Sequence, residues 1–272
     1  MSNLATRTIT GIVLVVLVIA AIIIDQYVFS ALFVVFTAVG LWEFYTLVER
    51  AGVFPNKPAG IFAGIVLFAS NALVAMDILE VQWLLLNFLF IFVIFLYELY
   101  RNDPNPFTNI AFTFFGLLYV AVPFSLLNYF PNPGFSPGGH HASILLGFFF
   151  LVWINETGAY VLGSAFGKHK LFERVSPKKT WEGAIGGGIL ALLTAWLVSL
   201  FYAQLSLSDW LIVALIVVVF GSYGDLFESM FKRSINAKDS GTILPGHGGV
   251  LDRFDGVFMA APFVFVYLLM TF

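Results

Sequence analysis

Residues Thr8 to Ile24 read TITGIVLVVLVIAAIII and contain no charged side chain. As a helix, a run of this length comes close to crossing the ~30 Å hydrocarbon core of a bilayer. Irregular backbone exposed to lipid is not tolerated at that depth, and the alternation of a barrel strand is missing. No small-residue cleavage site follows the run, so it is predicted to be a retained membrane-spanning helix and not a cleaved signal.

Apolar runs of similar length recur along the whole chain. Hydrophobic residues make up 60% of it and charged residues 11%, far from the composition of soluble domains. The predicted fold is therefore an all-α, polytopic integral membrane helix bundle with nine transmembrane helices. The predicted spans are 8–24, 28–48, 59–76, 81–97, 109–129, 142–163, 183–204, 209–231 and 254–271.

The basic residues test this map. All thirteen Lys and Arg fall before the first span or in loops on that same side of the membrane. The opposite loops carry only acidic or neutral residues, such as Asp25, Asp77 and Asp209. By the positive-inside rule, the N-terminus and both large basic loops are predicted to be cytoplasmic.

The chain is predicted to form a single domain over residues 1–272. Residues 1–130 are expected to be mainly scaffold spans, and residues 150–272 contain the polar clusters. Glu43, in Leu-Trp-Glu-Phe-Tyr, is interpreted as an interfacial carboxylate beside aromatic belt residues and is not assigned to chemistry. The absence of cysteine excludes disulfides, a thiolate nucleophile and cysteine metal sites, so any metal must be held by oxygen or imidazole.

Three polar clusters interrupt the second half of the chain. They read Asn-Glu-Thr-Gly-Ala-Tyr at 155–160, Ser-Pro-Lys-Lys-Thr-Trp-Glu-Gly at 176–183 and a long run from Ser229 to Asp255. The third combines cations, carboxylates and glycines, which let backbone approach a ligand. Such a mixture suits a phosphorylated substrate and a divalent cation.

Carboxylates near helix ends indicate a metal site. Asp225, Ser229 and Lys232 would share one helix face at i, i+4 and i+7. Asp252 and Asp255 would open the last span, so neighbouring helix ends could bring three carboxylates together. Such ligands favour Mg²⁺ or Mn²⁺ over zinc, and the alternative is a set of capping and interfacial salt bridges.

The cations of these clusters would face polyphosphate, because Lys and Arg side chains bind phosphate oxygens. They are Lys178, Lys179, Lys232, Arg233, Lys238 and Arg253. A basic loop can also be a solvated or anionic-lipid-binding face. For His247, a phosphate contact or a role in loop structure is favoured over metal ligation.

Two glycine-containing motifs are not assigned to chemistry. The stretch from Gly163 to His169 resembles a P-loop but lacks one spacer residue, the Ser or Thr after Lys, and a preceding strand. Gly183 and the glycines at 186–188 open a predicted span, where small residues indicate close helix packing.

The long run resembles the signature of the phosphatidate cytidylyltransferases, also called CDP-diacylglycerol synthases. The clusters at 157–160 and 176–183 are similar to that family too. Glu156 departs from the Asp usual there and is left out of the expected metal shell. The matching positions are Ser229, Lys232, Arg233, Lys238, Asp239, Gly241, Leu244, Pro245, His247, Gly248, Gly249, Asp252, Arg253 and Asp255.

The resemblance implies transfer of a cytidylyl group from CTP to phosphatidic acid, forming CDP-diacylglycerol and pyrophosphate in phospholipid biosynthesis. A compact chain of nine spans without an organellar targeting segment indicates a bacterial inner membrane, and the basic loops predict an active site on its cytoplasmic side. The expected catalytic residues are Asp225, Lys232, Arg233 and Asp252, and Mg²⁺ would be held by Asp225, Asp252 and Asp255. Expected substrate contacts come from Lys178, Lys179, Ser229, Lys238, Asp239, His247, Gly248, Gly249 and Arg253.

Several alternatives stay open. A second cation and a homodimer are compatible with the sequence, and no nucleic-acid partner is expected. A CTP-dependent lipid kinase would use a hydroxyl acceptor and release CDP. A transporter would show polar or broken helices at mid-membrane, whereas the polar residues here gather at one face.

Overall fold

The computed structural model describes residues 3–132, 142–237, 240–241 and 248–272. The chain forms two compact units. The first unit comprises Met1–Asn128 and Ser234–Arg253, and the second comprises Tyr129–Arg233 and Phe254–Phe272. Each unit draws on two stretches that are far apart in the sequence.

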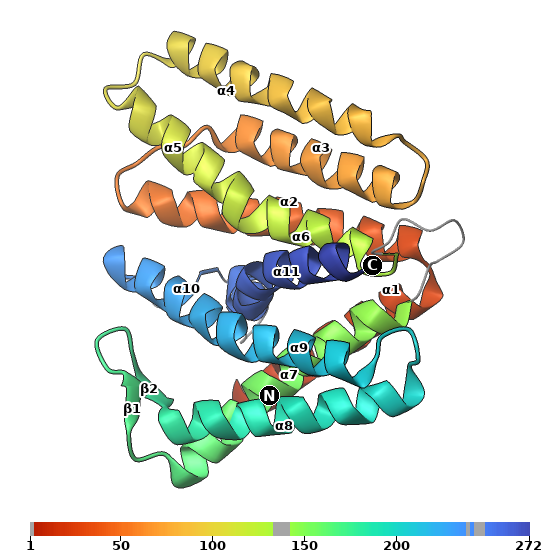
Figure 1. The fold of residues 1–272 in the computed structure, drawn as a ribbon. Coiled ribbons are helices and arrows are strands. Elements are labelled where there is room, and N and C mark those ends of the chain that lie inside the picture. Colours follow the sequence, from red (N-terminus) through yellow and green to blue (C-terminus); the bar gives the residue numbers. More distant parts are fainter. Residues whose placement is uncertain (1–2, 133–141, 238–239, 242–247) are drawn as a thin grey trace. The chain divides into compact units, whose positions relative to one another are not determined.

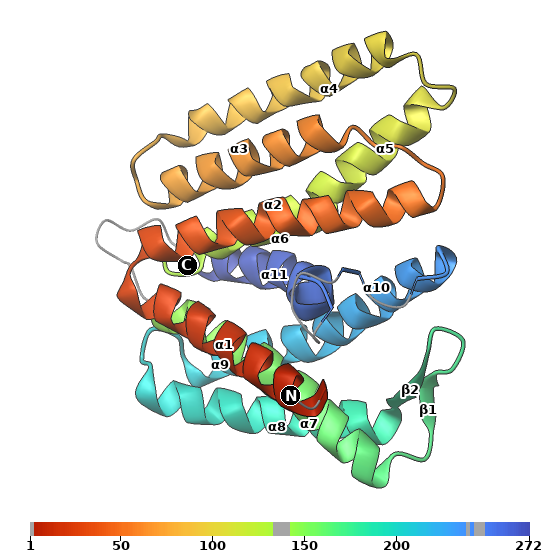
Figure 2. The ribbon, with the colours of Figure 1, turned by 180° about the vertical axis from the view of Figure 1, so that it is seen from behind.

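The first unit is built from helices, with α3 and α4 running side by side in both ribbon views (Figures 1 and 2). Asp25 caps α2 by accepting the N–H of Tyr27 at 2.7 Å. A 3₁₀ turn at Val81–Leu86 leads into α4. The helices are α1 (Asn3–Ile24), α2 (Gln26–Arg50), α3 (Lys57–Ala75), α4 (Asn87–Arg101), α5 (Pro106–Gly116) and α6 (Val122–Leu126).

The core of this unit is aromatic and centres on α2. The ring of Phe33 packs against Phe29 at 4.3 Å and edge-on against Phe124 at 5.3 Å between centroids. The hydroxyl of the fully buried Tyr45 donates to the carbonyl of Thr113 at 2.8 Å, which satisfies its polar end inside the bundle. Packing of large rings therefore stabilises the part of the chain that was predicted to be scaffold.

The second unit contains the remaining helices and a small hairpin. Strands β1 and β2 are antiparallel and link α7 to α8 (Figure 1). The α-helix α11 begins in the first unit's segment and continues through the second. The elements are α7 (Ala142–Phe166), β1 (Lys170–Phe172), β2 (Ser176–Thr180), α8 (Trp181–Phe201), α9 (Leu207–Ile216), α10 (Ser222–Ser234) and α11 (Leu251–Thr271).

Helices α7 and α8 approach each other closely at glycines. A Cβ atom added to Gly187 would lie 2.5 Å from the carbonyl oxygen of Asn155, and one added to Gly183 would lie 2.6 Å from that of Ala159. No side chain fits there, so glycine is required for the backbones to meet. The prediction that these glycines serve helix packing is confirmed.

Helices α9 and α10 form one continuous span that is interrupted by a π-helical turn at Val217–Gly221. A similar turn at Leu117–Ala121 separates α5 from α6. Such turns insert an extra residue into the helix and frequently accompany functional sites. The turn at Val217–Gly221 lines the polar cavity described below.

The predicted fold class is confirmed. In the described part of the chain, eight helices are long and apolar enough to cross a bilayer, and Ile9–Ile24 forms a shorter apolar helix. The hairpin was not predicted, because its strands are short and hold basic residues instead of alternating apolar ones. The cytoplasmic N-terminus and the single domain stay predictions.

Candidate functional site

A cavity of about 460 Å³ lies within the second unit. It is bounded by the C-terminal half of α7, strand β2, the start of α8, the π-helical turn and the start of α10. Its polar lining includes Asn155, Glu156, Lys178, Lys179, Ser222 and Asp225. The volume is in the range of small-molecule sites, and convergent polar groups in a mostly apolar cavity are typical of such sites.

An ion pair joins two elements across this cavity. Nζ of Lys179 on β2 lies 2.5 Å from Oδ2 of Asp225 on α10. The other carboxylate oxygen, Oδ1, accepts the hydroxyl of Ser229 at 3.3 Å. The shared helix face predicted for Asp225 and Ser229 is therefore confirmed, and the hairpin brings Lys179 to that face.

Further carboxylates surround Asp225. Asp255 of α11 is only 8% exposed, and the charges of Asp225, Glu156 and Glu228 all act on it together with that of Lys179. Gly256 and Gly224 give these groups room: a Cβ on Gly256 would lie 2.9 Å from Oε1 of Glu156, and one on Gly224 would overlap the carbonyl of Asp255. The second unit thus concentrates negative charge beside the cavity.

Glu228 was not singled out from the sequence, although it lies one helical turn after Asp225. It is 2% exposed, and its Oε2 pairs with Nζ of Lys232 at 2.5 Å. Lys232 was predicted to share a face with Asp225 and Ser229. The described contacts instead pair it with Glu228, so its charge is partly used inside the protein.

Asn155 lines the cavity and was also not predicted from the sequence to be a site residue. Its side chain is 5% exposed, and Oδ1 has no hydrogen-bond partner in the described part of the chain. Buried polar atoms are normally paired, so an orphaned acceptor on a cavity wall indicates that a ligand or water supplies the donor. Its position in the Asn-Glu-Thr-Gly cluster was the available signal.

The polar run from Ser229 to Asp255 is called the signature run from here on. In the first unit, Asp252 accepts three hydrogen bonds from this run. Its Oδ2 accepts Ser240 N–H at 2.9 Å, Ser240 O–H at 2.8 Å and Gly249 N–H at 2.8 Å. Gly248 has a φ of +82°, and a Cβ there would overlap the Asp252 carboxylate. Asp252 therefore organises the backbone that precedes α11.

Glu43 of α2 also reaches this segment. It is 2% exposed, and its Oε2 accepts the N–H of Leu251 at 3.1 Å. The prediction of an interfacial carboxylate is therefore wrong, because the side chain is enclosed by a segment more than 200 residues later. Nothing in the local sequence around Glu43 reveals that long-range partner.

The other predicted residues are less constrained. Arg233 lies in the last turn of α10, and Arg253 lies in the first turn of α11. Both side chains are exposed. Lys178 is exposed at the rim of the cavity. Lys238, Asp239 and His247 lie outside the described residues, so the roles predicted for them stay predictions.

Within the described ranges, no three His, Asp or Glu side chains form a preformed metal-binding group. The predicted ligands are nonetheless oxygen donors, and two of them, Asp225 and Asp255, are electrostatic neighbours. The magnesium prediction therefore depends on the chemistry and charge of these side chains. Asp252 is occupied by hydrogen bonds within its own segment.

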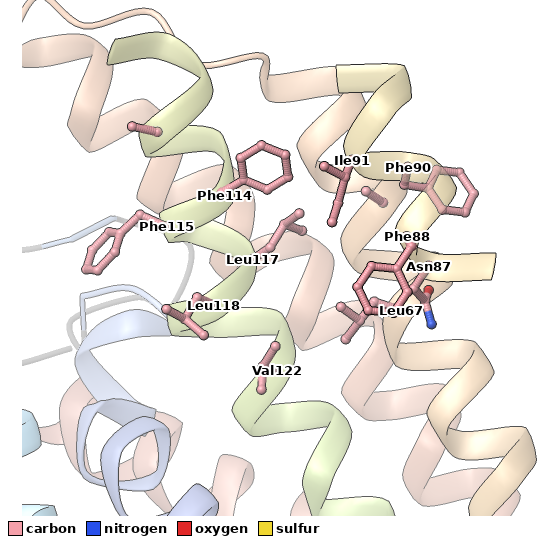
Figure 3. A pocket seen from close by; sticks show the side chains of 12 residues that line it. Leu67, Asn87, Phe88, Phe90, Ile91, Phe114, Phe115, Leu117, Leu118 and Val122 are labelled. Atoms are coloured by element: carbon pink, nitrogen blue, oxygen red, sulfur yellow. The ribbon is translucent and has the colours of Figure 1, made fainter. Parts of the chain in front are cut away.

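A second cavity, of about 570 Å³, lies in the first unit between α3, α4 and α5 (Figure 3). Its wall is made of aromatic and aliphatic side chains such as Phe88, Phe114 and Leu118, with Asn87 as the one polar residue among those that line it. Nδ2 of Asn87 donates to Ser70 at 3.0 Å. Such a cavity suits hydrocarbon and offers nothing to a nucleotide.

The model of the cytidylyltransferase family matches residues 5–271. The phosphatidate cytidylyltransferase of Staphylococcus haemolyticus is 41% identical over 180 residues, which are 65% of this chain and 66% of that protein. That of Staphylococcus aureus strain COL is 38% identical over 182 residues, 66% of this chain and 67% of that protein.

The matched part of each of these relatives is thus about two thirds of its length. The family model, in contrast, covers almost the whole chain, including α2 with Glu43 and the cavity of the second unit. The chain therefore belongs to the cytidylyltransferase family.

Proposed function

We propose that this membrane protein transfers the cytidylyl group of CTP to phosphatidic acid, forming CDP-diacylglycerol and pyrophosphate. Family membership and the names of the relatives support the reaction class. The observation that carries the proposal is the polar cavity of the second unit, which is lined by Lys178, Lys179, Asp225 and Glu156. This pairing of cations with carboxylates suits a phosphorylated substrate together with a metal ion.

In the proposed reaction, an oxygen of the lipid phosphate attacks the α-phosphorus of CTP. One P–O bond forms there, and the bond from the α-phosphorus to the bridging oxygen of the β-phosphate breaks, which releases pyrophosphate. A phosphate monoester has a second pKa near 6, so the nucleophile is anionic at neutral pH and needs no general base. The barrier is repulsion between two anions and their alignment.

The side chains of the second unit address that repulsion. Lys178 and Lys179 place two ammonium groups at the cavity, where they would neutralise phosphate oxygens. Asn155 adds an acceptor that has no hydrogen-bond partner among the described residues, which suits a hydroxyl or amino group of the substrate. Lys232 and Arg233 at the end of α10, and Arg253 with the Gly248–Gly249 backbone, are proposed to contact the triphosphate.

The residues around Asp255 fit a divalent cation. Three carboxylates act on Asp255. Lys179 offsets their charge and Lys232 pairs with one of them, Glu228, so negative oxygen donors remain in excess. Asp225 and Asp255 would hold Mg²⁺, with Asp252 as a further proposed ligand. When bound, the ion would lower the repulsion between the reacting phosphates and stabilise the charge on the leaving pyrophosphate.

The many apolar helices make the chain a multi-pass membrane protein. We propose that it resides in the bacterial inner membrane with the active site on the cytoplasmic side. The distribution of all thirteen Lys and Arg supports this orientation. CTP is soluble and phosphatidic acid is a lipid, so the reaction requires a site that both phases can reach.

The test is pyrophosphate release by purified protein supplied with CTP and phosphatidic acid, with and without Mg²⁺. Diacylglycerol serves as the control acceptor. Release that needs both phosphatidic acid and Mg²⁺ would support the proposal. CDP formation with diacylglycerol would indicate a lipid kinase, and ion movement without nucleotide consumption would indicate a transporter; either result would overturn it.

A further inference from the structure

Glu43 presents an acidic group that the proposed reaction does not use. It lies on α2, in the half of the chain predicted to be scaffold, and is 2% exposed. A buried carboxyl group is costly unless its environment satisfies it. Its surroundings must therefore explain why it is there.

Those surroundings are the backbone of the signature run. Oε2 accepts the N–H of Leu251, the first residue of α11, at 3.1 Å. Groups at the start of a helix lack partners within the helix, so Glu43 satisfies one of them from outside.

Two glycines of the run lie against the same carboxyl group. A Cβ on Gly241 would overlap Oε1 of Glu43, and a Cβ on Gly249 would overlap Oε2. Both glycines also belong to the family signature. Their lack of a side chain lets the backbone close around Glu43, which gives a physical reason for glycine at each position.

The carboxyl group of Glu43 is connected to Asp252 through this backbone. Gly249 donates its N–H to Oδ2 of Asp252 at 2.8 Å, and Ser240, next to Gly241, donates to the same oxygen. Oε1 of Glu43 has no hydrogen-bond partner among the described residues. One acidic residue of α2 thus lies against Gly241, which follows Ser240, and against Gly249, and both Ser240 and Gly249 donate to Asp252.

We propose that Glu43 is a positioning residue that holds the Gly248–Leu251 backbone, and with it Asp252, in the conformation used for cytidylyl transfer. The kinetic part of this inference rests on the proposed function. The structural part does not, because it concerns only the order of the segment. Glu43 acts through the backbone and is not assigned contact with substrate.

Two substitutions separate its roles. Glu43→Gln keeps an acceptor oxygen for Leu251 and removes the charge, whereas Glu43→Met keeps the approximate volume and removes the acceptor. Glu98→Gln is the matched control, because Glu98 is also 2% exposed in a helix of the first unit but bonds to Asn109 and Arg101. No hydrogen bond or ion pair joins Glu98 to the described part of the signature run.

The first measurement is hydrogen–deuterium exchange of peptides that contain Gly249 and Leu251, on purified protein in detergent. We expect exchange at least about tenfold faster in Glu43→Met, a smaller increase in Glu43→Gln and none in Glu98→Gln, because Glu43→Met removes the buried acceptor of the Leu251 N–H. Unchanged exchange in a folded Glu43→Met protein would overturn the proposal. If that variant does not fold, Glu43→Gln decides in the same way.

The second measurement is steady-state kinetics with CTP and phosphatidic acid varied in turn. We expect kcat/KM for CTP to fall at least about tenfold in Glu43→Met while the KM for phosphatidic acid is unchanged, because a displaced contact loop impairs alignment. Equal losses in Glu98→Gln would indicate general destabilisation and overturn the proposal. If wild-type protein releases no pyrophosphate, the proposed function fails, and the exchange result still tests the positioning role.

Discussion

Lys179 of β2 and Asp225 of α10 form an ion pair of 2.5 Å that joins the hairpin to the helix beside the polar cavity. Neither residue is fully buried, so the pair itself contributes little to stability. The ion pair matters for the geometry of the site, because it places a cation and a carboxylate next to each other in the cavity wall.

Replacement of Lys179 by Met should lower kcat/KM for CTP at least about hundredfold. The variant lacks the ammonium group that would stabilise the negative charge developing on the phosphates in the transition state. Thermal stability in detergent should change little, since the pair is partly exposed. Lys57→Met is the control, because Lys57 pairs with Glu49 at 3.2 Å in the first unit and lines no cavity described here. Wild-type kinetics in Lys179→Met would exclude this cavity as the active site.

Metal removal provides a second prediction. Chelation with EDTA should abolish pyrophosphate release, and Mg²⁺ or Mn²⁺ should restore it, because hard oxygen donors select these ions. Asp225→Asn should raise the Mg²⁺ concentration needed for half-maximal activity. Asp209→Asn, at the other end of the same span and bonded to Tyr267 at 2.7 Å, should not. Full activity in EDTA would contradict the magnesium proposal.

Asn155 gives a prediction in which activity and stability separate. Asn155→Leu should raise the KM for a substrate while the free energy of unfolding stays the same or increases, because an orphaned buried acceptor is replaced by an apolar group. In the control Asn109→Leu, two satisfied hydrogen bonds are lost, to Glu98 and to Phe54, at a cost of about 1–3 kcal/mol. Chemical denaturation and kinetics on both variants test this contrast. A strongly destabilised Asn155→Leu protein would refute it.

The contact between α7 and α8 predicts different costs for neighbouring glycines. An added Cβ at Gly187 meets backbone atoms of Asn155 and Ala159, which cannot move aside. At Gly186 it meets only the side chain of Leu162, which can change rotamer. Gly187→Ala should therefore cost about 1–3 kcal/mol and Gly186→Ala less, measured as thermal unfolding in detergent. Equal costs would show that this contact does not limit packing.

Much of this fold follows from the sequence, because hydrophobicity and length alone specify a membrane helix. The predicted spans 59–76 and 254–271 differ from α3 and α11 by no more than three residues at either end. The hairpin could not be predicted, since its strands are short and lack alternating apolar residues. The two π-helical turns leave the composition of their spans unchanged, so hydropathy does not reveal them either.

The candidate site was only partly predictable. Lys178, Lys179 and Asp225 were expected, and the cavity of the second unit brings them together. Asn155 and Glu228 were missed because burial, not residue type, distinguishes them. Glu43 was misread because its partner Leu251 is 208 residues away, and no local pattern encodes such a contact.

The π-helical turn at Val217–Gly221 has a consequence for how the span from Leu207 to Ser234 tolerates change. One extra residue in a turn rotates everything after it by roughly 100° relative to an uninterrupted α-helix. The orientation of Asp225 and Ser229 depends on this rotation of the helix after the π-helical turn. Deletion of a single residue here would preserve hydropathy and composition yet direct both side chains away from the cavity, so the length of this segment is under tighter constraint than its apolar residue types.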